Sequence, residues 1–221
     1  MLKQAKLVLF SVACVAICAA MMLLLSPTTV ASTGAFEVVA SQLENPRHLA
    51  FGPDGSLYVT EGGTGGPTCV NPDPGDPDFE VCMGQTGAIT KVDPQGNQSR
   101  LASDLYSLAI TFDATSPPEI TGPQGIDISD SGEMFVTIGL GASPDDREPL
   151  FGPPGLNLGQ LVEVEPDGAW SNVADIAAHE LTNPDGGVID SNPYGIHVID
   201  DSTLYAVDAG GNDLLHVTLQ P

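Results

Sequence analysis

The sequence predicts an all-β fold in which four-stranded antiparallel sheets repeat along the chain. One pattern spans residues 46–60 and returns at 123–137 and 193–207, with starting points 77 and then 70 residues apart. Each copy has a short alternating strand, a tight turn and a second strand, which is typical of a β-hairpin. Two more strands follow each of the first two copies, and sheets of four strands at this spacing are typical of β-propeller blades.

The third and fourth strands of these units have the same kind of turn between them. In the first unit, Gly87–Val92 leads through Asp-Pro-Gln-Gly into Ser99–Leu105. In the second unit, Gly159–Val164 leads through Glu-Pro-Asp-Gly into Ala169–Ile176. A short helix is expected at Asp175–Leu181. The clusters of Pro, Gly and Asp between strands mark connecting loops, so we expect one domain without a linker.

The third unit has strands at 195–199, 203–207 and Asp213–Leu219, and no fourth strand before Pro221. Near the other end, Phe36–Leu43 resembles an outer strand that could complete the last blade. The sequence then contains about three blades, whereas closed propellers have about 4–8. We therefore expect residues 32–221 to be a propeller domain that is incomplete at the C-terminus, from a protein of six blades. The alternative is that two copies combine into one ring.

The first 31 residues have the pattern of a signal peptide. Lys3 and Lys6 precede the apolar run Leu7–Leu25, and small residues follow it up to Ala31. The alternative is an uncleaved membrane anchor, because the run is almost long enough to cross a bilayer. Either interpretation predicts a secreted or periplasmic protein.

Two cysteines, Cys69 and Cys82, lie outside that segment in what reads as one loop. An even pair in an oxidising compartment predicts a disulfide. The alternative, a metal site, would need further Cys or His residues nearby, and the sequence has none there.

The chain is strongly acidic, with a formal net charge of −23. After residue 31 it has only four basic residues against 29 acidic ones. Such a surface repels phosphate, so we expect neither nucleic acid nor an anionic membrane as partner. Cations, neutral small molecules and proteins remain open, although high charge also serves solubility alone.

The long connections all fall on one edge of the expected sheets, which makes that edge the predicted functional face. They are Glu61–Thr86, Gly139–Leu158, Ala177–Pro193 and Asp208–Asp213. The candidate ligand residues on this face are Arg47, Glu61, Arg147, Asn183, Asp185, Asn212 and Asp213. Among its oxygen-bearing side chains, Asp190, Asn192 and Asp208 are candidate ligands for a divalent cation such as calcium. Asp and Asn are also ordinary turn residues, so a structural role is the alternative.

Several segments resemble the ScyD/ScyE family: 45–59 with Glu-Gly-Gly at 61–63, 84–92, 183–195 and 207–215. The resemblance covers essentially all of 36–218. It implies an exported β-propeller related to the NHL and SMP-30/gluconolactonase-like group, in a family named after the gene cluster for the pigment scytonemin. Members are longer at the C-terminus, which agrees with an incomplete chain. Kinship of fold does not by itself transfer an activity.

The resemblance also implies a divalent-metal centre. The gluconolactonase-like group binds a divalent metal through the Glu of Glu-x-Pro and an Asn that follows Ser. Here Glu44-Asn45-Pro46 and Ser191-Asn192 match those two short patterns, which makes Glu44 and Asn192 metal candidates.

Two functions follow as hypotheses. The first is a non-enzymatic binding protein with an accessory role in an extracytoplasmic pathway such as scytonemin-type pigment biosynthesis, with a small molecule or protein bound on the loop-rich face. The alternative is a metal-dependent lactonase or esterase. That enzyme would need a general base beside the metal, and the sequence singles out none.

Overall fold

The computed structural model describes residues 34–182 and 185–219. The predicted signal peptide or anchor, residues 1–31, and the candidate Asn183 lie outside the described residues. The chain divides into a unit of residues 1–37 and a unit of residues 38–221. Residues 34–37 contain no regular secondary structure. Nowhere in the described residues is a helix both long and apolar enough to cross a membrane.

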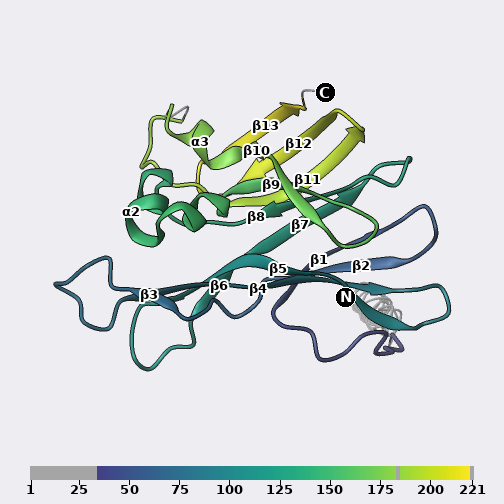
Figure 1. Cartoon of the computed structure of the whole chain (residues 1–221), viewed down its shortest axis with the longest axis horizontal. Helices are drawn as coiled ribbons and strands as arrows, with labels where there is room; N and C mark the ends of the chain where they lie inside the picture. Colours follow the sequence, from purple (N-terminus) through teal and green to yellow (C-terminus); the bar gives the residue numbers. More distant parts are fainter. Residues whose placement is uncertain (1–33, 183–184, 220–221) are drawn as a thin grey trace, which may run out of the picture. The chain divides into compact units, whose positions relative to one another are not determined.

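The second unit is all-β, as predicted, and contains three antiparallel sheets (Figure 1). The first sheet has the order β1-β2-β4-β5-β6, with β3 also paired to β4. Its strands are β1 (Pro46–Phe51), β2 (Leu57–Glu61), β3 (Thr68–Val70), β4 (Glu80–Val92), β5 (Gln98–Thr111) and β6 (Glu119–Thr121). The second sheet consists of β7 (Pro123–Ile128), β8 (Met134–Ile138), β9 (Gln160–Val164) and β10 (Trp170–Asp175). The third consists of β11 (Pro193–Asp200), β12 (Thr203–Asp208) and β13 (Asp213–Thr218).

Short helices occur in the connections. The segment between β8 and β9 contains η1 (Pro144–Asp146), α2 (Arg147–Phe151) and η2 (Pro153–Asn157). The predicted helix after β10 is present as α3 (Ile176–Glu180). Asp175 caps its N-terminus by accepting a hydrogen bond from the backbone N–H of Ala178.

The tight turns lie on the edge of the sheets opposite the long connections, and they repeat one geometry. In each of four hairpins, two backbone hydrogen bonds close a five-residue turn, as between Gly52 and Ser56 and between Gly55 and Gly52. The fourth residue of each turn is a glycine with positive φ, from 77° at Gly55 to 99° at Gly132. Only glycine adopts this conformation without strain, so the Gly-containing turns of the sequence were a reliable signal.

The first strands of the three sheets adjoin one another, because β7 packs against both β1 and β11. The buried side chains form two clusters, one between the first and second sheets and one between the second and third. β8 contributes to both: Met134 and Val136 belong to the first cluster and Phe135 to the second. Alternating side chains of one strand therefore serve two separate interfaces.

In the first and second sheets, a threonine near the end of the second strand, Thr60 of β2 and Thr137 of β8, links the sheet to the next one. The Thr60 hydroxyl accepts a hydrogen bond from the His48 N–H and donates one to the Gln124 carbonyl of the next sheet, at 3.0 and 2.6 Å. Thr137 repeats this one sheet further along: its hydroxyl accepts from the Gly125 N–H and donates to the Tyr194 carbonyl, at 2.9 and 3.1 Å. The same three-point contact thus recurs at both junctions.

We expect Thr60→Val and Thr137→Val each to lower the free energy of unfolding by about 1–2 kcal/mol. Valine keeps the shape of the side chain but leaves one N–H and one carbonyl without their partner. The measurement is urea denaturation followed by circular dichroism, with Thr218→Val, at an exposed position of β13, as control. Losses no larger than that of the control would show that the hydroxyls do not join the sheets.

Two sequence expectations were wrong. The predicted loop 61–86 is partly strand, since β3 and the first half of β4 form a hairpin beyond the predicted sheet. Residues 36–43 form no strand. An outer strand needs the backbone groups of a neighbour, and the Ser41 backbone instead exchanges two hydrogen bonds with the side-chain amide of Gln98, at 3.1 and 2.9 Å.

Candidate functional site

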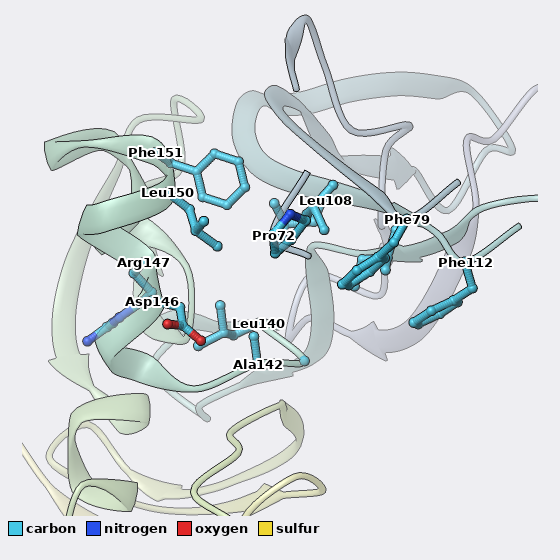
Figure 2. Close-up of a pocket in the computed structure, with 13 residues that line it drawn as sticks. Pro72, Phe79, Leu108, Phe112, Leu140, Ala142, Asp146, Arg147, Leu150 and Phe151 are labelled. Carbon is cyan, nitrogen blue, oxygen red and sulfur yellow. The ribbon is translucent and has the colours of Figure 1, made fainter. Parts of the chain in front are cut away.

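Two adjacent pockets lie on the edge that carries the long connections, where function was predicted. The first is an apolar crevice of about 200 Å³. Figure 2 shows Phe79, Phe112 and Pro72 on one side and Leu150 and Phe151 of α2 on the other. The rings of Phe79 and Phe112 are stacked, with centroids 5.6 Å apart. This wall offers flat apolar surface to a ligand.

The second pocket, of about 240 Å³, is more polar than the first. Arg47, Gln124 and Tyr194 line it, and each directly follows the proline with which β1, β7 or β11 begins. The three sheets therefore each contribute the equivalent residue to one pocket. Asn192 lines it as well, so two of the sequence candidates, Arg47 and Asn192, meet here.

The two pockets share a wall formed by Ile110, Phe112 and Gly141. A molecule seated across that wall would place an apolar part in the crevice and a polar part in the second pocket. Pockets that bind small molecules combine these features: mainly apolar walls and a few fixed polar groups.

A chain of hydrogen bonds fixes the polar groups. The Leu140 N–H and the Thr121 hydroxyl both donate to Asn192 Oδ1, at 3.3 and 3.4 Å. Because the Thr121 hydroxyl donates its only proton to Asn192, it acts as the acceptor toward Gln124: it accepts a hydrogen bond from Gln124 Nε2, at 3.2 Å. The other end of that amide, Gln124 Oε1, is buried and accepts no hydrogen bond in the described residues. Gln124, which lines the pocket, therefore has one buried acceptor without a partner in the described residues.

Arg147, a predicted ligand residue, is structural. Its side chain is 4% exposed, and its guanidinium points away from the crevice (Figure 2). It makes two hydrogen bonds of 3.0 and 3.1 Å to the Asp175 carboxylate and donates to the carbonyls of Pro144 and Leu158. Arg147 thereby ties the α2 wall of the crevice to the start of α3.

Glu61 and Asp208 are equivalent residues, each opposite the proline that begins its sheet. Both side chains are buried, and both carboxylates accept hydrogen bonds from other groups of the protein. Glu61 accepts from the Glu44 N–H and the Thr90 hydroxyl, at 2.7 and 2.6 Å, and lies 3.4 Å from the Arg100 guanidinium. Asp208 accepts from the Ser191 hydroxyl and from three backbone N–H groups. Both carboxylates therefore hold loops in place.

In the described residues, the acidic metal candidates Glu44, Asp190 and Asp208 form no compact group with one another. Glu44 is exposed. Asp190 is half-buried with Oδ1 unpartnered, and burial together with the nearby Asp208 raises the pKa of its carboxyl. Within residues 34–182 and 185–219, one group of three Cys, His, Asp or Glu side chains has ligand atoms all within 4.8 Å of one another, and it contains none of these residues.

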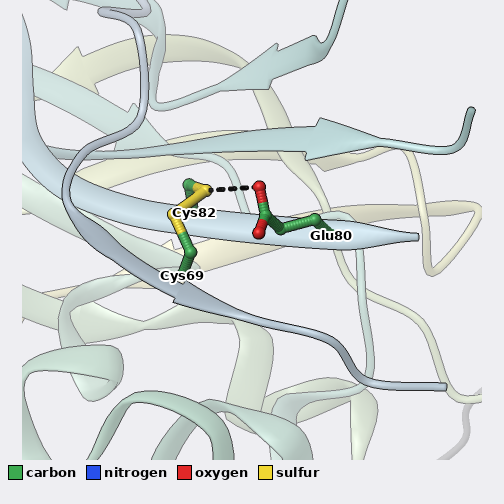
Figure 3. A group of neighbouring side chains, drawn as sticks. All are labelled: Cys69, Glu80 and Cys82. Carbon is green, nitrogen blue, oxygen red and sulfur yellow. Dashed lines mark hydrogen bonds between the residues drawn. A yellow bond between two sulfur atoms is a disulfide. The ribbon is translucent and has the colours of Figure 1, made fainter. Parts of the chain in front are cut away.

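That one group consists of Cys69, Glu80 and Cys82 (Figure 3). The predicted disulfide between Cys69 and Cys82 is present, joining directly opposite residues of β3 and β4. Glu80 Oε2 lies 3.4 Å from Cys82 Sγ. A disulfide sulfur is not a thiolate, so the group is a covalent link between strands and lacks the donors of a metal site.

The remaining candidates surround α3 and the turn after β12. Asp185 accepts a hydrogen bond from the Asn212 side chain, at 3.2 Å, and Asp213 is half-buried at the start of β13. Sequence reasoning missed Glu180, which is buried beside them and whose Oε1 has no partner in the described residues. Burial, with the nearby charges of Asp185, Asp208 and Asp213, raises the pKa of the Glu180 carboxyl.

Comparisons with protein-family models and with curated proteins returned no match for this chain.

Proposed function

We propose that this protein is an exported β-propeller of the ScyD/ScyE type that binds a small amphiphilic molecule in the groove formed by its two adjacent pockets. The continuity of an apolar crevice with a polar pocket through Ile110, Phe112 and Gly141 carries the proposal. The expected ligand has a flat apolar part and a group that donates a hydrogen bond to Gln124 Oε1. As the resemblance implies, it would serve an extracytoplasmic pathway such as pigment biosynthesis.

Three observations support a propeller. The first strands of the sheets adjoin, core clusters fill the space between consecutive sheets, and the Thr60 and Thr137 contacts repeat from one junction to the next. These are the relations expected between neighbouring blades. The Cys69–Cys82 disulfide supports export, because disulfides persist in oxidising compartments.

The dye 1-anilinonaphthalene-8-sulfonate is a suitable probe, because it combines aromatic rings with an N–H donor. We expect saturable binding of one dye molecule per folded chain. Phe112→Ala should weaken the binding about tenfold, since it removes the shared wall and one of the two stacked rings. Fluorescence titration measures the dissociation constant of the dye for the wild type and for the Phe112→Ala variant.

The matched control is Phe51→Ala, because Phe51, like Phe112, is an exposed phenylalanine, and it does not line the groove. Its dye affinity should equal that of the wild type. Equal weakening by both substitutions, or dye uptake that does not saturate, would count against the groove as the binding site. Unchanged circular dichroism of each variant establishes that the comparison concerns folded protein.

A further inference from the structure

The last residue of α3, Glu180, holds its carboxylate against the turn that follows β12. Its side chain is 1% exposed. A Cβ atom on Gly211 would stand 2.6 Å from Oε2 of Glu180 and 3.4 Å from Cγ of Asp208. Glycine at position 211 therefore leaves room for two carboxylates to flank the same stretch of backbone.

Among the described residues, Glu180 forms no salt bridge. Its Oε1 is buried, and no described residue donates a hydrogen bond to it. A buried carboxylate without hydrogen bonds or a counter-charge is strongly unfavourable. The negative charge of Glu180 must therefore be neutralised by a proton or by a cation from solution.

The lysine and arginine side chains of the described residues interact with groups other than Glu180. Lys91 pairs with Asp54, Arg100 with Glu61 and Arg147 with Asp175, and Arg47 donates to the Ile120 carbonyl. The side chains around this turn are instead acidic: Asp185 accepts a hydrogen bond from Asn212 of the turn, and Asp208 and Asp213 are the paired residues on either side of it. This corner of the molecule concentrates negative charge around an unpartnered oxygen.

We propose that Glu180 anchors a site for a hard divalent cation such as calcium, with Asp185 and Asp213 as the further acidic ligands. Carboxylate oxygens are the ligands that calcium prefers. Asp208 has a different part in the site. Its oxygens already accept four hydrogen bonds from nearby hydroxyl and backbone N–H groups, so it shapes the turn and adds negative charge.

A cation accounts for these groups better than a proton does. A proton would neutralise Glu180 alone and leave the other carboxylates repelling one another, whereas a divalent ion attracts all of them. Asp185 is exposed and Asp213 half-buried, and the ligand atoms of the three residues do not all lie within 4.8 Å of one another. Binding one ion through all three residues therefore requires Asp185 and Asp213 to move toward Glu180. This site is separate from the groove and does not depend on the proposed function.

The test uses the full chain after treatment with a chelator and its removal. Equilibrium dialysis against calcium chloride should show one ion per chain. At a calcium concentration about a hundredfold above Kd, Tm should rise by roughly 5 °C or more. Glu180→Gln should abolish most of the rise, while the control Glu165→Gln, at an exposed residue of the β9–β10 turn, should retain it.

Each outcome decides the proposal. A wild-type chain that binds no calcium overturns it, whether or not the Glu180→Gln variant folds. An equal calcium response in wild type and Glu180→Gln also overturns it, because the ion then binds elsewhere. Should Glu180→Gln fail to fold, Asp213→Asn takes its place: a Tm rise at least halved supports the site, and an unchanged rise overturns it.

Discussion

Replacing Arg147 by methionine should lower the free energy of unfolding by about 3 kcal/mol. Methionine can occupy much of the space of the buried side chain but makes none of its hydrogen bonds. The carbonyls of Pro144 and Leu158 would lose their donor, and Asp175 would lose the cation that it faces at 3.0 Å. Because Asp175 is partly exposed, water would recover some of that loss.

The same substitution should also weaken dye binding in the groove. Arg147 connects the α2 wall, with Leu150 and Phe151, to the start of α3, so its loss frees that wall to move. Urea denaturation and dye titration measure the two effects on one sample. The control is Lys91→Met, which removes an ion pair with Asp54 at the surface and should cost less than about 1 kcal/mol. Equal losses for the two variants would contradict a structural role for Arg147.

Removing the disulfide by the double substitution Cys69→Ser, Cys82→Ser should lower stability by about 3 kcal/mol, as expected for a closed loop of this length. It should also reduce dye affinity, because Phe79 and Pro72 of the crevice lie within the segment that the disulfide closes. The measurement is urea denaturation of oxidised wild type, reduced wild type and the variant.

Reduced wild type serves as the internal comparison, because it keeps both cysteine side chains and lacks only the bond. The variant and the reduced protein should unfold at the same urea concentration, below that of the oxidised protein. A variant as stable as the oxidised protein would show that the strand pairing between β3 and β4 suffices without the bond.

The hairpins were predictable from sequence because their signals are local. Alternating apolar residues and a turn with glycine in its fourth position mark β1–β2 and β7–β8, and both are present. Where the signals conflict, the prediction failed. Gly84 was predicted to lie in the loop 61–86, yet it lies in β4. A Cβ on Gly84 would stand 2.5 Å from Cα of Gly66, so glycine there serves close backbone contact.

The candidate site was predictable only in part. Arg47 and Asn192 were chosen from the sequence and do line the polar pocket. Gln124 and Tyr194 were missed, although they occupy the same position of the repeat as Arg47, and an alignment of the three copies would have found them. Glu180 gave no such signal, since its burial depends on the turn around Gly211, which is distant in sequence.

The cross-strand disulfide between Cys69 and Cys82 limits the effect of proteolytic cleavage on the protein. Residues 71–78, between Cys69 and Cys82, form an exposed tip with prolines at 72, 74 and 77. Exposed tips of this kind are preferred sites of cleavage. A single cut there would leave the two pieces covalently joined and β3 still paired with β4. The nicked molecule would keep the same mass, apart from one added water, until it met a reductant, so damage at the tip would not by itself dismantle the crevice wall.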